Sequence, residues 1–335
     1  TYHNSLVNDE VWATGASWWQ IARDYGHTDE HLIKPYQMGV SYANPLKDPI
    51  YNMFYSPDTM EFYRKAMNDL RFNIRTHYHA IHDLGRWGLD IQDPHFQKMV
   101  SEIERGTKLL NRFDPPKPKI ELLLVFGMEG LCNWYPDSKA KNPYHLNGKM
   151  KVGEKAQALW EAGYFNAVIP SDEIVDGKVS VDEIGQLHYN GHIFKGMVFI
   201  NPQYSKEQTI RFLEDFTSSE GKLMMDGKAT HDFEGNDIAS RFQAIYEKST
   251  VQGFHPDRIP ELGCVIDTLM NGSRINDGSV ILTDLGSLVS NTPAPFNLSI
   301  NGDSYTGEYM GLMAIKVSSG GYLEKLACRQ FKELK

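Results

Sequence analysis

The clearest pattern of hydrophobic and polar positions lies in the middle of the chain. Continuous apolar runs at 120–127 (IELLLVFG), 194–201 (FKGMVFIN) and 222–227 (KLMMDG) are typical of strands buried on both faces. Between them, 154–165 and 205–221 show helical spacing, and 166–174 (NAVIPSDEI) is a short strand with a polar end. We expect Ser205 to cap the second helix and Gly221 to end it. This alternation predicts a parallel sheet with helices on both faces.

The pattern changes after about residue 250. A connector with prolines and glycines (TVQGFHPDRIP) leads to short apolar stretches, SVILTDL, FNLSI, EYMGLMAIKV and YLEKLAC, separated by NDG, NGD and SSGG. Short strands joined by Asn, Asp and Gly turns are typical of antiparallel sheets. The sequence therefore predicts a small antiparallel β-sandwich at 255–335.

Before residue 113 the pattern is less regular. Stretches 37–44 and 72–80 have the character of strands, and a helix with Asp58 as its cap lies between them. A further helix is expected over 94–112, with Asp93 as N-cap and Pro94 as the first helical residue. Two strand–helix units cannot close a barrel, but they would form its last quarter.

Two proline-bearing connectors suggest the domain boundaries. The segment 113–119 (FDPPKPK) holds three prolines and cannot continue a helix. We therefore expect an α/β protein in three parts: 1–113, the last part of a (β/α)₈ barrel; 119–249, a doubly wound parallel-sheet domain; and 255–335, the sandwich.

Composition restricts the possible partners. The formal net charge of −9 argues against nucleic acid or an anionic membrane, and no apolar run is long enough to span a membrane. We expect a soluble protein, cytoplasmic or periplasmic, without choosing between them. The three cysteines are far apart and form no CxxC pair, so no zinc knuckle or disulfide framework is indicated. No cofactor is expected.

The chemically richest stretch is RTHYHAIHDLGRWG, residues 75–88. On a strand, alternate residues share a face, so Arg75, His77 and His79 would point to the same side. The following loop adds the polar and aromatic side chains of His82, Asp83, Arg86 and Trp87. In a barrel this end of the strand carries the active site. Mixed hydrogen-bonding groups beside an aromatic ring suit a neutral sugar, with Asp83 as the candidate catalytic residue.

A metal site is the alternative interpretation of the same stretch. HYH followed by His82 is similar to the HxHxDH motif of metallo-β-lactamase-type hydrolases. The order differs, since Ile81 stands where the aspartate belongs and Asp83 follows His82. A bare HxH pair is a weak indicator of metal, so we expect no metal here.

The parallel-sheet domain shows no motif for chemistry. GMEGLCNWYP after its first strand contains neither GxGxxG nor a phosphate loop, and no GxSxG elbow exists in the chain. Asn201-Pro202 follows the strand after which an amidotransferase of this fold would place its nucleophilic cysteine. Cys132 is expected to be a small buried residue, whereas Trp134 could reach a neighbouring sugar site.

Residues 119–335 resemble glycoside hydrolase family 42, the β-galactosidases and their relatives. The resemblance rests on the ALWEAG helix, the strand that leads into NPQY, the helix–glycine–strand ending at 205–227, and the GEYMGLMAIKV and YLEKLAC strands. It implies that the middle domain is an amidotransferase-like trimerisation domain without a catalytic cysteine. It also implies a homo-oligomer, an oligo- or polysaccharide substrate, and two catalytic glutamates.

No glutamate before residue 61 follows a convincing strand. We therefore expect the catalytic pair upstream of Thr1, and this chain to be the C-terminal portion of a β-galactosidase-like enzyme. A non-catalytic carbohydrate-binding or assembly scaffold is the alternative, and a metal-dependent hydrolase is a third.

Overall fold

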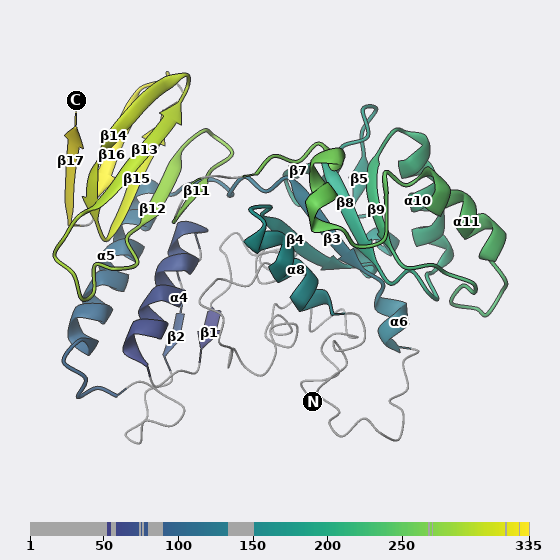
Figure 1. Cartoon of the computed structure of the whole chain (residues 1–335), viewed down its shortest axis with the longest axis horizontal. Coiled ribbons are helices and arrows are strands. Elements are labelled where there is room, and N and C mark those ends of the chain that lie inside the picture. The colour runs from purple at the N-terminus through teal and green to yellow at the C-terminus, as the bar shows by residue number, and fades with distance from the viewer. Residues whose placement is uncertain are drawn as a thin grey trace. The chain divides into compact units, whose positions relative to one another are not determined.

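The computed structural model describes residues 52–54, 58–73, 75, 77–79, 90–132, 151–266, 269, 271–318, 320–327 and 329–334. These residues group into two compact units. Unit 1 holds the described residues between Ile120 and Asp267, and unit 2 holds those of Asp48–Lys119 and Thr268–Lys335 (Figure 1). The chain is mixed α/β, with parallel and antiparallel sheets, as the sequence predicted. The three-part division at 113–119 and 249–255 stays a prediction.

Unit 1 is built on a five-stranded sheet whose strands all pair in parallel, in the order β10-β9-β8-β3-β4. Its strands are β3 (Leu122–Phe126), β4 (Asn166–Pro170), β8 (Gly196–Ile200), β9 (Lys222–Asp226) and β10 (Val251–Gln252). Its longer helices are α8 (Val152–Glu161), α10 (Glu207–Ser218) and α11 (Ala239–Lys248). Every residue of β3, β4 and β8 is buried, which explains their continuous apolar runs. The parallel sheet predicted for this segment is confirmed.

Several short elements of unit 1 were not predicted from the sequence. Strands β5 (Ser180–Val181), β6 (Leu187–Tyr189) and β7 (His192–Phe194) form a small antiparallel sheet. Helices α6 (Met128–Cys132) and α9 (Asp172–Val175) follow β3 and β4, and the 3₁₀ helix η4 (Pro256–Leu262) follows β10. Strands of two or three residues are too short for alternation to distinguish them from loops.

Two predicted helix starts are wrong by a short distance. Helix α10 begins at Glu207 with Lys206 as its N-cap, because the Ser205 hydroxyl donates to the carbonyl oxygen of Pro202 at 2.7 Å. Helix α5 (Phe96–Phe113) has His95 as its N-cap. The Asp93 carboxylate instead accepts the backbone N–H of His95 at 2.8 Å. Both side chains stabilise the turn before the helix. Ser and Asp are favoured in such turns as well as at N-caps, so either role fits these residue types.

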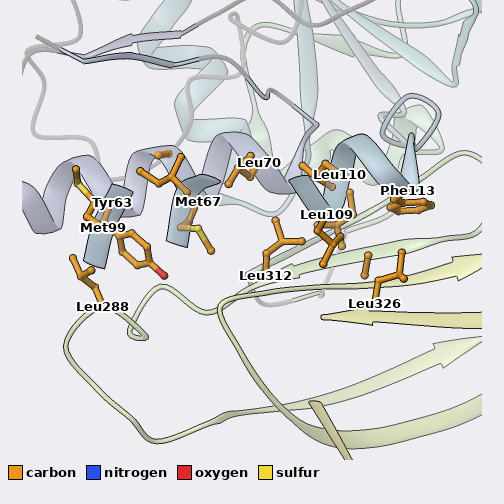
Figure 2. Packing of buried hydrophobic residues seen from close by; sticks show 14 of the residues in the cluster. Tyr63, Met67, Leu70, Met99, Leu109, Leu110, Phe113, Leu288, Leu312 and Leu326 are labelled. Atoms are coloured by element: carbon orange, nitrogen blue, oxygen red, sulfur yellow. The ribbon is translucent and has the colours of Figure 1, made fainter. Parts of the chain in front are cut away.

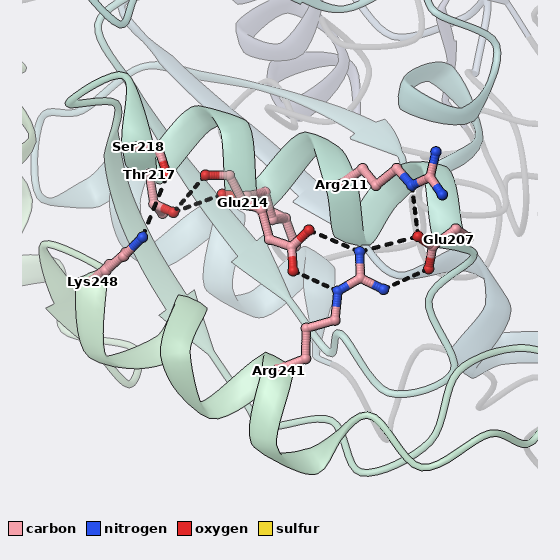
Figure 3. Close-up of polar contacts among 8 residues, drawn as sticks. Glu207, Arg211, Glu214, Thr217, Ser218, Arg241 and Lys248 are labelled. Atoms are coloured by element: carbon pink, nitrogen blue, oxygen red, sulfur yellow. Dashed lines mark hydrogen bonds and ion pairs between the residues drawn. The ribbon is translucent and has the colours of Figure 1, made fainter.

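An ion-pair network joins α10 to α11 in unit 1 (Figure 3). The Arg241 guanidinium donates to Glu207 at 2.7 and 3.1 Å and to Glu214 at 2.5 and 2.8 Å. Arg211 donates to Glu207 at 2.7 Å. Arg241, with Arg211 beside it, lowers the pKa of Glu207 to about 2, and Arg241 also holds the pKa of Glu214 below its usual range. Lys248 of α11 also donates to Ser218 of α10.

Unit 2 is a stack of three layers. One layer is the antiparallel sheet β11-β12-β15-β16, and a second is the antiparallel sheet β13-β14-β17. Their strands are β11 (Gly272–Arg274), β12 (Val280–Thr283), β13 (Ala294–Ile300), β14 (Asp303–Met310), β15 (Leu312–Val317), β16 (Leu323–Ala327) and β17 (Gln330–Leu334). The third layer is the helix pair α4 (Thr59–Arg71) and α5. The antiparallel sheets predicted after residue 255 are confirmed.

The four-stranded sheet is apolar on both faces because its strands alternate. Val280 and Leu282 of β12 and Ile315 of β15 pack with Phe296 and Leu298 of the other sheet. The intervening residues turn the other way, where Ile281, Leu312, Ala314 and Leu326 pack against α4 and α5. Figure 2 shows Met67, Leu70, Leu109 and Leu110 of the helices in one cluster with Leu312 of the sheet. A strand period of two thus lets one sheet hold two hydrophobic cores.

One strand of a parallel pair precedes each helix of this layer. Strand β1 (Asn52–Phe54) leads into α4, and β2 (His77–His79) lies before α5. The two strands pair in parallel, with Asn52 opposite His77 and Phe54 opposite His79. The predicted cap of α4 is confirmed, since the Asp58 carboxylate accepts from the N–H groups of Met60 and Glu61 at 2.7 and 3.1 Å. The expected strand at 37–44 lies outside the described residues.

We expect Arg241→Ala to destabilise unit 1 by about 1 kcal/mol, because these charges are about one-third exposed and water screens them. The pKa of Glu207 is depressed in the folded state. The stabilisation is therefore present above the ordinary glutamate pKa and is lost as the pH falls toward 2. Hydrogen exchange of α10 and α11 between about pH 7 and pH 3 measures the effect. Arg211→Ala, at a side chain 71% exposed, is the matched control, and equal losses in both variants would contradict the prediction.

Candidate functional site

The stretch chosen from the sequence as the sugar site is only partly described. His77 and His79 lie on β2, and Arg75 precedes it. His82, Asp83, Arg86, Trp87 and Trp134 lie outside the described residues. The structure therefore places His77 and His79 on one strand, with Arg75 two residues before it, and the grouping of all eight residues stays a prediction.

Arg75 has clear partners at the amino end of β2. Its guanidinium donates to Asn73 at 2.7 Å, to Asn111 at 3.1 Å and to Asp114 at 3.1 Å. These contacts join the segment before β2 to the C-terminal end of α5. In a βα repeat, ligands bind at the opposite, carboxyl end of the strand. The observed role of Arg75 is thus structural, and a role in sugar binding is a prediction only.

The best-described candidate site is the carboxyl edge of the parallel sheet in unit 1. In chain order the strands occupy positions 2-1-3-4-5 across the sheet, so the order reverses between β3 and β8. Open α/β sheets bind ligands at such a switch point, outside the carboxyl ends of the strands. The residues that follow β3 and β8 here are Gly127–Gly130 and Asn201–Gln203.

Asn201 fills this switch point. It adopts a left-handed backbone with φ 54°, a conformation that Asn tolerates better than most residues. A Cβ atom added at Gly127 would collide with the carbonyl oxygen of Asn201, and one at Gly130 would collide with its side-chain Nδ2. The two glycines are therefore required for the close approach of Asn201, which occupies the place where a ligand or a nucleophile would otherwise lie.

Glu129 and Ser171 close the edge beside Asn201. The Ser171 hydroxyl donates to Oε2 of Glu129 at 2.7 Å and accepts the N–H of Met128 at 2.9 Å. Glu129 is 2% exposed, and its Oε1 has no hydrogen-bond partner. Burial raises the pKa of Glu129, the Ser171 hydrogen bond opposes that shift, and Asp172 adds to it. This carboxyl could hold a proton, but no substrate reaches it in this arrangement because it is buried.

Ion pairs occupy the carboxyl ends of β4 and β9. Asp172, after β4, accepts from the Lys206 amine at 2.9 Å. Asp226, at the end of β9, pairs with Lys155 of α8. Among the described residues no group of three or more His, Cys, Asp or Glu side chains could hold a metal ion. No described helix is both long and apolar enough to cross a bilayer.

Neither the protein-family models nor the curated proteins contain a match to this chain. The chain is similar in structure to the family 42 β-galactosidase Gan42B from G. stearothermophilus, at 14% identity and a TM-score of 0.39, over 87% of this chain and 40% of that one. It is similar to a family 42 exo-carrageenase from Bacteroides ovatus, at 12% identity and a TM-score of 0.41, over 89% and 43%.

A rhamnosidase from Novosphingobium sp. PP1Y is also similar, at 10% identity and a TM-score of 0.37, over 78% of this chain and 26% of that one. The resemblance to family 42 expected from the sequence thus reappears among the similar solved structures. The chain spans less than half the length of each of these three proteins.

We expect Ser171→Ala to destabilise unit 1 by about 1–3 kcal/mol, since it leaves a buried carboxyl oxygen and a buried N–H without partners. Glu129→Gln is the matched comparison and should change stability much less, because burial already favours the uncharged acid. Urea unfolding at neutral pH measures the free energy of unfolding of both variants, and hydrogen exchange of β3 and β4 shows whether the loss lies in unit 1. A larger loss for Glu129→Gln than for Ser171→Ala would show that the charged form is required.

Proposed function

We propose that this chain is the C-terminal portion of a β-galactosidase-like glycoside hydrolase that acts on an oligo- or polysaccharide. In this proposal residues 1–113 form the end of a (β/α)₈ barrel. The observation that carries it is the parallel pairing of β1 and β2 across helix α4, with α5 after β2. Two adjacent parallel strands joined by a helix are the repeating element of such barrels.

The position of the candidate residues supports a sugar site at this pair. Residues 80–88 follow the carboxyl end of β2, the end at which barrel enzymes place their catalytic and binding groups. The proposed site contains His77, His79, His82, Asp83, Arg86 and Trp87. A neutral sugar offers hydroxyl groups and an apolar ring face, which such hydrogen-bonding groups and a tryptophan recognise.

The closed edge of unit 1 supports an accessory role for that unit. Asn201, Glu129 and the two ion pairs occupy the strand ends at which a catalytic α/β domain would carry its reactive groups. The family resemblance given by the ALWEAG helix and the strand before NPQY implies the same role, an amidotransferase-like domain without a nucleophile. We therefore assign the chemistry to the barrel and not to this unit.

The test uses the full-length protein and a panel of aryl glycosides and polysaccharides. We expect Asp83→Ala and Trp87→Ala each to lower kcat/KM by about tenfold or more, which corresponds to about 1.4 kcal/mol. Tyr322→Ala, at an aromatic side chain 80% exposed on a turn of unit 2, is the matched control and should have no effect. Glycan binding without turnover by the full-length protein would favour the scaffold alternative. Stoichiometric zinc that is lost in His77→Ala and His79→Ala would favour the metal-dependent hydrolase.

The same proposal assigns contact between copies of the chain to unit 1, as the family resemblance implies. Unit 1 exposes two large aliphatic side chains near its small sheet, Ile184 at 73% and Ile193 at 54%. We expect light scattering to give a homo-oligomer at micromolar concentration. Ile193→Asp should shift the protein toward the monomer if this sheet lies in the contact. A strict monomer for the unmodified protein would contradict the assignment.

A further inference from the structure

Unit 2 contains a group of buried charges that the proposed function does not use. We call it the carboxyl cluster: Glu102 of α5, Asp284 directly after β12, and Arg329 directly before β17. Glu102 is 2% exposed and Asp284 7% exposed, and the side chain of Arg329 is 20% exposed. Glu102 lies on the same side of α5 as the apolar residues of the helix layer, where an acid has a high desolvation cost.

Neither carboxyl is fully satisfied. Oε1 of Glu102 lies 3.5 Å from Nε of Arg329 and 3.5 Å from Nη1 of Arg105, and its Oε2 has no partner. One oxygen of Asp284 accepts the N–H of Gly286 at 2.9 Å, and its Oδ2 has no partner. A buried carboxylate oxygen without a donor is costly, and the cheapest remedy is a proton on that oxygen.

The surroundings join four parts of unit 2 at this point. The Tyr63 hydroxyl of α4 contacts Oγ of Ser287 at 2.5 Å and the carbonyl oxygen of Asp284 at 3.2 Å. Lys98 of α5 donates to the carbonyl oxygen of Leu288, and Arg329 donates to that of Ser287. Figure 2 shows Tyr63 beside Met99 and Leu288 at one end of the helix layer.

Three basic side chains face the two acids, but they do not offset the effect of burial on the pKa of Glu102. Burial raises the pKa of Glu102, Arg329, Arg105 and Lys98 lower it, and Asp284 raises it further. Burial also raises the pKa of Asp284, while the backbone N–H groups of Gly286 and Gly311 and the Arg329 guanidinium oppose this shift. Burial raises the pKa of Tyr309 on β14, and Asp284 adds to that shift. A carboxyl whose folded pKa is raised stabilises the fold while it is protonated, and this stabilisation is lost as the pH rises through the folded pKa.

We propose that the carboxyl cluster is a pH-sensitive contact of unit 2. With a proton held by Glu102 or Asp284, the cluster fastens α5 to the segment 284–290 and to the start of β17. When the pH rises and both acids ionise, two buried negative charges lie beside the partly buried guanidinium of Arg329, Arg105 is largely exposed, and this contact loosens. Acid therefore tightens the packing of the helix layer on its sheet, and alkali weakens it.

Hydrogen exchange of the full chain tests this proposal, with rates corrected for the intrinsic effect of pH. Between about pH 5.5 and about pH 8.5, protection of α5 and of residues 284–290 should fall by about tenfold or more. Helix α10 of unit 1 serves as the internal reference and should not show this loss. The double variant Glu102→Gln and Asp284→Asn, which cannot ionise, should remain protected at the higher pH.

Glu104→Gln is the matched control, because Glu104 lies on the exposed side of the same helix. It should keep the pH dependence of the unmodified protein. Loss of protection in the double variant at both pH values would show that the ionised acids stabilise the fold through Arg329, and would overturn the proposal. Identical pH profiles for the double variant and the unmodified protein would also overturn it.

If the double variant does not fold, Asp284→Asn alone is compared by infrared spectroscopy. The unmodified protein at about pH 6 should show the carbonyl band of a buried, protonated carboxyl group, and this band should be weaker in Asp284→Asn and lost at about pH 9. Absence of that band at about pH 6 would overturn the proposal without depending on the stability of any variant.

Discussion

Unit 2 depends on the alternation of side chains along β12 and β15. Ile281, Leu312 and Ala314 face the helices, while Leu282 and Met313 face the second sheet. Each fully buried aliphatic side chain contributes about 1.5–3 kcal/mol. A shift of either strand by one residue would exchange the two faces and mismatch both cores at once. The register of this one sheet therefore fixes the positions of α4, α5 and the outer sheet together.

The packing of α4 and α5 on this sheet explains how the segment that begins near residue 52 belongs to the same unit as the strands near residue 334. Helix α4 follows β1 and carries Phe62 and Met67 into the core formed with strands more than two hundred residues later in the chain. The strands β1 and β2 have only three residues each, too few to be stable as an isolated pair. Helix α4, which connects them, and helix α5, which follows β2, pack on the antiparallel sheet, so this sheet supports the proposed sugar site indirectly.

The sequence predicted those elements whose signal is strong and local. The apolar runs of β3 and β8 and the Asp58 cap of α4 were identified because burial on both faces and capping leave a direct mark on residue types. Ser205 and Asp93 were misassigned since their side chains can serve a turn as well as a cap. The packing of α4 and α5 on β12 and β15 was not predicted, because an amphipathic pattern shows that a face is buried but not its partner.

For the candidate site too, the local sequence predicted some features, and others depend on contacts between segments far apart in the chain. The sequence indicated a parallel-sheet domain without a nucleophile, and Asn201-Pro202 marked the place. Only the structure shows why that place is closed, since the close approach of Asn201 to Gly127 and Gly130 involves segments about seventy residues apart. An open switch point would have made unit 1 the first place to seek chemistry. Because Asn201 and the Ser171–Glu129 pair fill it, the polar residues beyond β2 are the stronger candidates, and substitutions at Asp83 and Trp87 separate the two possibilities.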